Sequence, residues 1–229
     1  MPRKARVAPG GYIYHIMNQS AWRLKMFKTP ADCAMFEQVM VEAHENEPLR
    51  MLGYCLMPDR WHMVVWPRDD QQLSNFVRWL SVTHAMRWRV AHRSAGDGHL
   101  YRSRFRAFPV QKSERLLEVL RYVEGNALVH KQVARAENWQ WSSLWARRNG
   151  PDEIKSLLCD WPVPRPANWS KLVNRPFAPE ILDRLQISEK RDRPYGDDAW
   201  VARTALKLGL EHTIRRVGRP TNAELAARG

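Results

Sequence analysis

Two short apolar runs joined by a tight turn constrain the fold of this chain more than any other feature. The runs cover residues 50–57 and 61–66, and Pro58-Asp59-Arg60 between them is typical turn sequence. Pro67 ends the second run, because proline has no backbone N–H to donate to a neighbouring strand. Apolar runs of this length, placed so close together, predict a β-hairpin and therefore an antiparallel sheet.

The segments around this hairpin alternate between strand and helix patterns. Thr29 and Pro30 form a helix start signal, and Pro109 marks its strand as a sheet edge. In chain order we predict a strand at 10–19, a helix from 30 to about 46, the two hairpin strands, a helix at 69–91, a strand at 104–111 and a helix at 113–129. This order predicts an α+β fold, namely a ferredoxin-like antiparallel sheet with helices on one face.

The composition of the chain changes after about residue 150. Prolines cluster at positions 162, 164 and 166 and again at 176 and 179, which indicates an extended segment that wraps the preceding part. A short helix is predicted at about 198–208, followed by a basic tail. We therefore predict one domain over residues 1–150 and a proline-rich, basic C-terminal extension over residues 151–229.

The chain carries a large excess of positive charge. It has 37 Lys and Arg residues against 24 Asp and Glu residues, a formal net charge of +13. Basic side chains neutralise phosphates and release counterions, so nucleic acid is the first partner class to expect. Helices that bind membrane surfaces concentrate such charge on one amphipathic face, whereas here it is spread along the chain between Trp and Tyr residues.

The sequence predicts no membrane partner and a reducing compartment. No stretch approaches the roughly 20 apolar residues of a membrane span, and the basic N-terminus leads into no apolar signal segment. The three cysteines, Cys33, Cys55 and Cys159, are far apart and odd in number, which is typical of reduced thiols. We therefore expect a cytoplasmic protein.

Three residues are candidates for chemistry, although each has an ordinary structural explanation. His62 lies in a predicted strand, where a hydrogen-bonded structural histidine is the simpler interpretation. Tyr122 alone is consistent with a core tyrosine. Asn126 follows it by four residues, so the two share one helix face, and this common spacing can place a nucleophile beside a metal ligand. The remaining histidines show no paired ligand spacing and are interpreted as structural or surface residues: His15, His44, His84, His92, His99, His130 and His212.

Longer strings around these residues resemble a known family. The strings are GYCLMPDRWHMVVWP at 53–67, GHLYRSRF at 98–105, RYVEGNALV at 121–129 and WQWSS at 139–143. Together with the proline-rich segment and a Gly-Arg-Pro sequence near the C-terminus, they resemble the REP-associated tyrosine transposases, a branch of the single-tyrosine HUH transposases. The resemblance covers nearly the whole chain in register.

This resemblance implies a DNA-cleaving chemistry and the residues that carry it. In the family, two histidines separated by one apolar residue hold a divalent metal, Mg²⁺ or Mn²⁺, against a phosphate of single-stranded DNA. A helical tyrosine attacks the phosphorus and forms a 5′-phosphotyrosine bond, and a polar residue one turn later completes the metal shell. The matching residues are His62 as the second histidine, Tyr122 as the nucleophile and Asn126 as the third ligand.

The chain departs from the family pattern at the first histidine, because its motif is Arg60-Trp61-His62. A guanidinium group stays protonated and offers no lone pair to a cation. At roughly 4 Å and an effective dielectric constant of about 20, it repels a divalent ion by about 8 kcal/mol. Arg60 therefore either contacts the phosphate directly through its fork of donors or leaves the metal site impaired.

Basic residues beside aromatic ones predict the DNA-binding surface. The sequence Tyr-Arg-Ser-Arg at 101–104 lies in a glycine-bearing loop before a strand, which favours contact with a DNA backbone. The Gly-Arg-Pro sequence around Arg219 resembles a minor-groove arm, with a plain basic end as the alternative. The predicted DNA-binding residues are Arg60, Tyr101, Arg102, Arg104, Arg106 and Arg219.

Two functions fit these residues, and Arg60 separates them. The first is a transposase-like single-stranded DNA endonuclease and strand transferase that acts at REP-type hairpins through Tyr122 and works as a monomer. The second is a catalytically degenerate protein that binds hairpin DNA without efficient cleavage. A generic RNA-binding module ranks below both, because the sequence lacks the paired aromatic string of such modules.

Overall fold

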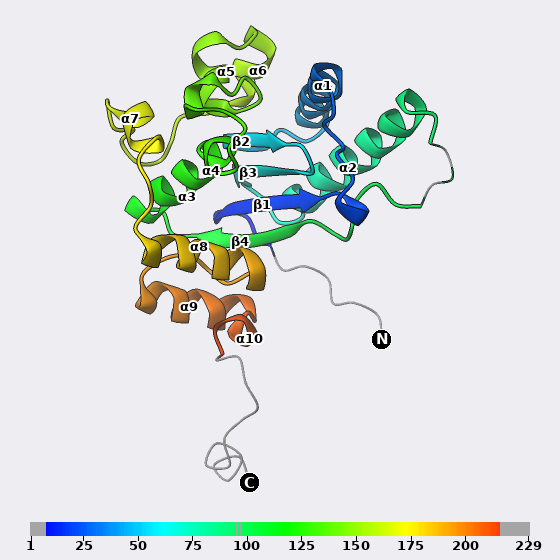
Figure 1. Ribbon diagram of the computed structural model, residues 1–229. Helices are drawn as coiled ribbons and strands as arrows, with labels where there is room; N and C mark the ends of the chain where they lie inside the picture. Colours follow the sequence, from blue (N-terminus) through cyan, green and yellow to red (C-terminus); the bar gives the residue numbers. More distant parts are fainter. Residues whose placement is uncertain (1–7, 95, 97, 216–229) are drawn as a thin grey trace.

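One antiparallel sheet of four strands forms the centre of the fold. The computed structural model describes residues 8–94, 96 and 98–215 (Figure 1). All neighbouring strand pairs are antiparallel, in the order β2-β3-β1-β4, which confirms the predicted ferredoxin-like sheet. The strands are β1 (Ile13–Gln19), β2 (Arg50–Met57), β3 (Arg60–Trp66) and β4 (Arg106–Val110).

The β2–β3 hairpin closes where the turn sequence predicts. Met57 pairs with Arg60, so Pro58 and Asp59 form a two-residue connection. Strand β4 pairs with β1 alone among the named strands of the described chain and lies at the edge of the sheet, as the presence of Pro109 predicts. The two central strands, β1 and β3, therefore each have a neighbouring strand on both sides.

Helices α1 (Pro30–Asn46) and α2 (Gln72–Ala91) cover one face of the sheet. Helix α1 begins with a capping box, in which the Thr29 side chain accepts a hydrogen bond from the Asp32 N–H and the Asp32 carboxylate accepts one from the Thr29 N–H. The strand side chains in the core on this face are Tyr14, Ile16, Met51, Tyr54, Leu56, Trp61, Met63 and Val65.

Helices α3 (Glu114–Glu124), α4 (Asn126–Val129) and α7 (Trp169–Val173) belong to the opposite face, where Figure 1 shows α3 across the sheet from α2. The sequence predicts helices on one face of the sheet, and α1 and α2 form that layer. The helices on the opposite face form a second layer that the prediction did not include. A Cβ atom at Gly53 would lie only 3.0 Å from Leu120 Cδ2, so glycine lets α3 approach β2 closely.

The predicted elements occur in the predicted order, and several are shorter than predicted. The first strand begins at Ile13 rather than at residue 10, and the second long helix begins at Gln72 rather than at residue 69. The helix predicted over 113–129 divides into α3 and α4 at Gly125. A Cβ atom added at Gly125 would lie 3.4 Å from Val173 Cγ1 on α7.

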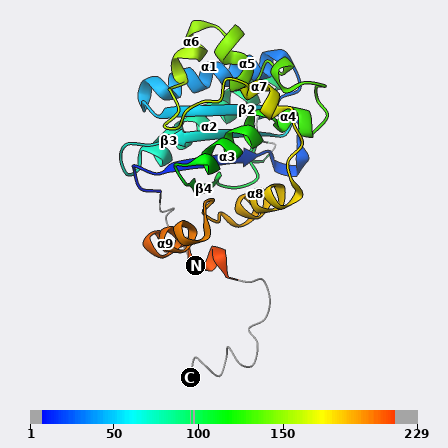
Figure 2. The ribbon, with the colours of Figure 1, turned by 90° about the vertical axis from the view of Figure 1, so that its left-hand side faces the viewer.

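The chain after α4 packs along both edges of the sheet. At the β2 edge, Leu158 pairs with Met51 in a parallel bridge. At the β4 edge, Tyr195 pairs with Val110 in the same way. Figure 2 shows both α8 and α9 at the β4 end of the sheet, away from β2. The elements of this region are the 3-10 turn η2 (Ala136–Asn138) and helices α5 (Ser143–Asn149), α6 (Asp152–Leu157), α8 (Pro179–Arg191), α9 (Asp198–Leu208) and α10 (Glu211–Ile214).

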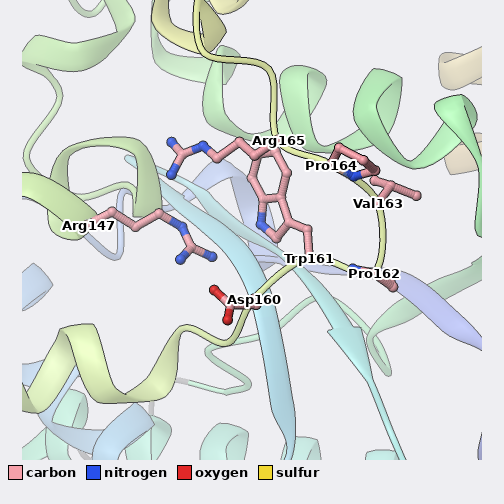
Figure 3. A pocket seen from close by; sticks show the side chains of 7 residues that line it. All are labelled: Arg147, Asp160, Trp161, Pro162, Val163, Pro164 and Arg165. Carbon is pink, nitrogen blue, oxygen red and sulfur yellow. The ribbon is translucent and has the colours of Figure 1, made fainter.

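The proline-rich segment 160–165 is attached to β2 through Trp161 and Arg147 (Figure 3). The Trp161 indole N–H donates to the Leu52 carbonyl at 2.8 Å, and Arg147 donates to the same carbonyl at 3.0 Å. The Arg165 guanidinium lies 4.9 Å from the centre of the Trp161 ring. These groups line a surface cavity of about 480 Å³. Because its polar groups bond to the backbone of β2, we interpret this cluster as structural.

Two predictions about the environment of the chain can be compared with the structure. Across residues 8–94, 96 and 98–215, no helix has both the length and the hydropathy that a membrane crossing requires. The three cysteines are free thiols, with Cys33 and Cys55 buried. The division of the chain at residue 150 and its cytoplasmic location stay predictions.

Glu37 makes the stability of the fold depend on pH. The Tyr54 hydroxyl donates to Glu37 Oε1 at 2.6 Å, and burial raises the pKa of Glu37 to about 7. A carboxyl whose pKa is raised on folding stabilises the protein below its unfolded pKa and loses that stabilisation as the pH rises through 7. We expect the unfolding free energy to fall by roughly 2 kcal/mol between pH 5 and pH 8.

Glu37→Gln provides the control for this prediction, because an amide keeps an acceptor for Tyr54 and has no proton to lose. Urea unfolding at both pH values measures the difference. If the variant and the parent protein lost the same stability between pH 5 and pH 8, Glu37 would not be the source of the pH dependence.

Candidate active site

Two histidines from neighbouring central strands meet on the face of the sheet that α3 covers. His62 lies on β3, and His15 lies on β1, diagonally across from it, because His62 pairs directly with Met17. The two rings lie within hydrogen-bond distance, since His15 Nε2 is 3.1 Å from His62 Nδ1. Both side chains are buried. The sequence interpretation of His15 as structural or surface therefore missed its place beside His62.

Both imidazoles are held in the neutral form. Burial lowers the pKa of His15 to about 3, and the neighbouring His62 adds to the effect. Burial likewise lowers the pKa of His62 to about 3, helped by the charge of Arg60. In a neutral imidazole, one of the two ring nitrogens carries a lone pair that can accept a hydrogen bond or bind a metal. His62 Nε2 is buried and has no hydrogen-bond partner in the described part of the chain, so its lone pair can point at a ligand.

Tyr122 reaches the same place from α3. Its ring packs edge-on against His62, with ring centroids 6.1 Å apart, and 6.3 Å from His15. Its hydroxyl donates to Glu189 Oε2 at 2.8 Å. Burial raises the pKa of the Tyr122 phenol, and the negative charge of Glu189 raises it further, whereas Arg60 opposes the change. The predicted nucleophile therefore lies beside the predicted histidine, with a carboxylate ready to accept its proton.

Arg60 sits at the rim of this group and is paired with its neighbour in sequence. Its Nε and terminal nitrogen donate to the two Asp59 oxygens at 2.9 and 3.0 Å. Asp59 accepts a third hydrogen bond, from Gln19 Nε2 at 3.0 Å. Burial acts to raise the pKa of Asp59, but the bonds from Arg60 and Gln19 outweigh it and lower that pKa. The carboxylate thus offsets part of the charge with which Arg60 would repel a cation.

The donor atoms of the site suit a divalent cation. Ligand atoms of His15, His62 and Glu189 lie within 4.8 Å of one another. Asn126, the predicted third ligand, is buried at the start of α4, and its Oδ1 has no partner within the ranges that the structure describes. Buried polar atoms are normally paired, so the two free atoms leave His62 and Asn126 able to accept a ligand. Imidazole, carboxylate and amide oxygen together suit Mn²⁺ at least as well as Mg²⁺.

The predicted DNA-binding residues differ in what they contact. Arg102 is exposed, whereas Arg106 donates to the Lys190 carbonyl at 2.6 Å and pairs with Asp192 at 3.6 Å. Arg104 is also exposed to solvent. A cavity of about 350 Å³ brings Arg60, Arg102, Arg106 and Glu189 together with residues 17–19 and 103. Arg219 lies outside the described residues.

Tyr101 is turned into the protein rather than outward. Its hydroxyl accepts from the Trp61 indole N–H at 3.2 Å and lies 2.6 Å from His84 Nδ1. Burial lowers the pKa of His84 to about 3, so this ring is neutral and its Nδ1 can accept the phenol proton. The hydroxyl is therefore engaged inside the fold, while the ring still lines a surface cavity beside Arg102.

His15 and Glu189 are the two site residues that sequence reasoning missed. A histidine in the middle of an otherwise apolar strand next to the hairpin was a signal for His15, because antiparallel pairing places alternate residues of β1 and β3 on one face. Glu189 gave no such signal. It lies 67 positions after Tyr122, on α8, and only the path of the C-terminal chain brings it back to the sheet.

Comparison with known proteins identifies related folds. The model of the family described as "Transposase IS200 like" matches residues 10–126. A solved REP-associated tyrosine transposase bound to a REP hairpin aligns with a TM-score of 0.50 and 14% identity, over 62% of this chain and 82% of that one. A crystal structure of a putative transposase from Deinococcus radiodurans R1 aligns with a TM-score of 0.39 and 18% identity, over 54% of this chain and 96% of that one. None of the curated proteins matches this chain.

Tyr101→Phe tests whether the hydroxyl of Tyr101 serves the fold. The change leaves the Trp61 indole N–H and His84 Nδ1 without a partner in the interior, so we expect a loss of about 1–3 kcal/mol in the free energy of unfolding. Urea unfolding measures it. Arg102→Ala, at the exposed neighbour, is the matched control and should change stability by less than about 0.5 kcal/mol. Equal stability of Tyr101→Phe and the parent protein would contradict the structural role.

Proposed function

Because the chain belongs to the IS200-like transposase family, we propose that it cleaves and rejoins single-stranded DNA beside a hairpin through a covalent bond to Tyr122. The observation that carries this proposal is that side chains from three elements lie next to one another. These are the Tyr122 phenol from α3, the His62 ring from β3 and the Glu189 carboxylate from α8. A nucleophile, a neutral ligand and a proton acceptor are the groups that this reaction needs.

In the proposed reaction, Glu189 removes the proton from the Tyr122 hydroxyl as the phenolic oxygen attacks the phosphorus. The 2.8 Å hydrogen bond between the two groups already has the geometry for this transfer. A bond forms between the phenolic oxygen and the phosphorus, and the bond to the 3′ oxygen breaks. The 3′ oxygen leaves with the electron pair of that bond and takes up a proton from solvent, so the products are a 5′-phosphotyrosine and a free 3′ hydroxyl. Since burial raises the phenol pKa, the attack depends on the nearby Glu189 carboxylate to take the phenol proton.

We infer that His62 and Asn126 would hold a divalent cation, with Mn²⁺ favoured over Mg²⁺. Their unpartnered buried atoms, His62 Nε2 and Asn126 Oδ1, support this assignment. The hydrogen bond between His15 and His62 Nδ1 fixes the orientation of the ligating ring, as partners of metal-bound histidines commonly do. When bound, the cation would stabilise negative charge on the phosphate.

Arg60 is proposed to take part by contacting phosphate. A guanidinium fork matches the geometry of phosphate oxygens, and the two bonds to Asp59 hold the group at the rim of the pocket. Arg102, Arg104 and Arg106, with the Tyr101 ring, extend this surface, and we propose that they contact the DNA backbone. The structural relative with a bound REP hairpin supports hairpin DNA as the partner, although the likeness itself is one of fold.

A second candidate function is binding of hairpin DNA without efficient cleavage. The observation that favours it is Arg60, which stands where the family places a metal ligand and brings a positive charge instead. Both functions need the same DNA surface and differ only in the chemical step.

A covalent adduct distinguishes the two functions. We expect the parent protein, incubated with Mn²⁺ and a hairpin bearing single-stranded flanks, to form a protein–DNA adduct that survives a denaturing gel. Tyr122→Phe should reduce the adduct to background, because phenylalanine has no oxygen to attack with. Tyr12→Phe, at a tyrosine near the start of β1, is the matched control and should retain the adduct.

Arg60→His separates an impaired enzyme from an active one. No adduct in the parent protein, with one formed by Arg60→His, would identify a degenerate binder. If neither protein bound hairpin DNA more tightly than duplex DNA of the same length, both candidate functions would be wrong.

Metal binding is tested without DNA, through thermal stability. A cation that binds only the folded state raises the melting temperature, and the rise grows with the logarithm of the ratio of its concentration to Kd. We expect Mn²⁺ to raise the melting temperature of the parent protein and His62→Ala to abolish the rise. Arg60→His should lower the apparent Kd for Mn²⁺ by about tenfold or more, because it removes repulsion and adds a lone pair.

Arg60→Gln is the control for the charge alone. It removes repulsion without adding an imidazole, so its Mn²⁺ affinity should fall between those of the parent protein and Arg60→His. Equal affinity in all three proteins would mean that the cation binds elsewhere.

A further inference from the structure

Trp22 is exposed to solvent to an extent that is unusual for tryptophan. It lies in the 3-10 turn η1 (Ala21–Arg23), directly after β1, and is 95% exposed. Its backbone has φ 55° and ψ 27°, the left-handed region that bulky residues seldom adopt. Neither core packing nor backbone preference accounts for a tryptophan at this position. Strained, exposed positions of this kind occur mostly at binding sites.

The backbone directly before Trp22 is fixed by two hydrogen bonds to neighbouring segments. The Ser20 N–H donates to the Asp59 carbonyl at 2.9 Å, and the Ala21 N–H donates to the Leu100 carbonyl at 2.8 Å. The first bond ties the turn to the β2–β3 connection, and the second ties it to the loop before β4. The indole is therefore displayed from a backbone position that the surrounding structure sets.

Trp22 lines a cavity whose chemistry suits single-stranded DNA. The cavity has a volume of about 980 Å³, and its wall includes Arg60, His99, Tyr101 and Arg102. The acidic residue in this wall, Asp59, is paired with Arg60. An exposed aromatic ring beside guanidinium groups is the arrangement with which proteins stack unpaired bases and follow the phosphates. Two guanidinium groups and a carboxylate already paired with one of them give this wall a charge that favours a polyanionic strand.

The same cavity adjoins the candidate active site. Gln19, Arg60 and Arg102 line both this cavity and the smaller one that contains Glu189. Glu189 in turn accepts the hydrogen bond from Tyr122. A DNA strand with one phosphate at Tyr122 can therefore pass Arg60 and Arg102 and bring a neighbouring base to the indole.

We propose that Trp22 is a stacking platform for an unpaired base that flanks the cleaved phosphate. This inference rests on the proposed function, because it takes single-stranded DNA as the substrate, and it adds a base-binding subsite to that function. The subsite would hold the strand on one side of Tyr122, while the arginines neutralise the phosphates between them.

The test compares DNA with and without an unpaired flank. Fluorescence anisotropy with EDTA measures binding of a fluorescein-labelled hairpin that carries single-stranded flanks, and of the same hairpin with blunt ends. We expect Trp22→Ala to weaken binding of the flanked hairpin by about tenfold, and that of the blunt hairpin by less than about twofold. Trp22→Phe should retain most of the affinity. Leu206→Ala, at another exposed apolar residue on α9, is the matched control and should change neither.

An abasic nucleotide identifies the stacked base. Placed at one position of the flank, it should weaken binding by the parent protein about tenfold and leave the affinity of Trp22→Ala unchanged, since the lost contact is shared. Equal affinity of Trp22→Ala and the parent protein for the flanked hairpin would overturn the proposal. An equal loss for both hairpins would overturn it as well.

Two further measurements keep this proposal separate from the others. Trp22→Gly should melt at or above the temperature of the parent protein, because glycine adopts this φ without strain. A lower melting temperature would mean that Trp22 serves the fold, which overturns the proposal. The Tyr122 adduct is measured separately, so an adduct with no effect of Trp22→Ala on binding rejects the subsite alone. If the parent protein itself does not bind hairpin DNA, the proposed function is wrong.

Discussion

The antiparallel pairing of β1 with β3 is the constraint on which the site depends. It places His15 and His62 on the same face of the sheet and brings their rings within hydrogen-bond distance, in an interior that keeps both neutral. A protonated pair at this distance would repel strongly. The paired backbones of β1 and β3 thus fix the positions of the two imidazoles and leave their side chains little freedom. Helix α3 then places Tyr122 next to them.

The charged groups around His15 and His62 follow an order from the interior of the site to the surface. The neutral His15 and His62 rings lie at the centre, Tyr122 beside them donates a hydrogen bond to Glu189, and Arg60 with Asp59 lies at the rim. Arginine residues farther out carry the excess positive charge of the chain toward solvent. Such an arrangement attracts a phosphodiester from outside while the interior stays free of net cationic charge. It also explains how a guanidinium is tolerated beside buried histidines, because its carboxylate partner is adjacent in sequence.

Local sequence signals predicted most of the fold but only part of the site. The hairpin, the capped start of α1 and the bounds of α9 follow from turn residues, a capping box and apolar spacing, all of which act over a few positions. His62 and Tyr122 were found through longer strings. His15 required knowledge of which strands pair, and Glu189 required the path of the chain after α4. Strand pairing and the path of the chain both depend on residues far apart in the sequence. For the same reason, the sequence alone could not show that the Tyr101 hydroxyl is bonded inside the protein and not exposed at its surface.

The bridges of Leu158 to β2 and of Tyr195 to β4 have a consequence for how copies of this protein meet one another. Open strands at the rims of a sheet invite a second chain to add its own, which leads to continuous intermolecular ribbons. Here the returning C-terminal chain bridges one residue of each outer strand with its own backbone, Met51 on β2 and Val110 on β4. A second chain would therefore find fewer free backbone groups at either rim, and the four-stranded sheet is less open to extension.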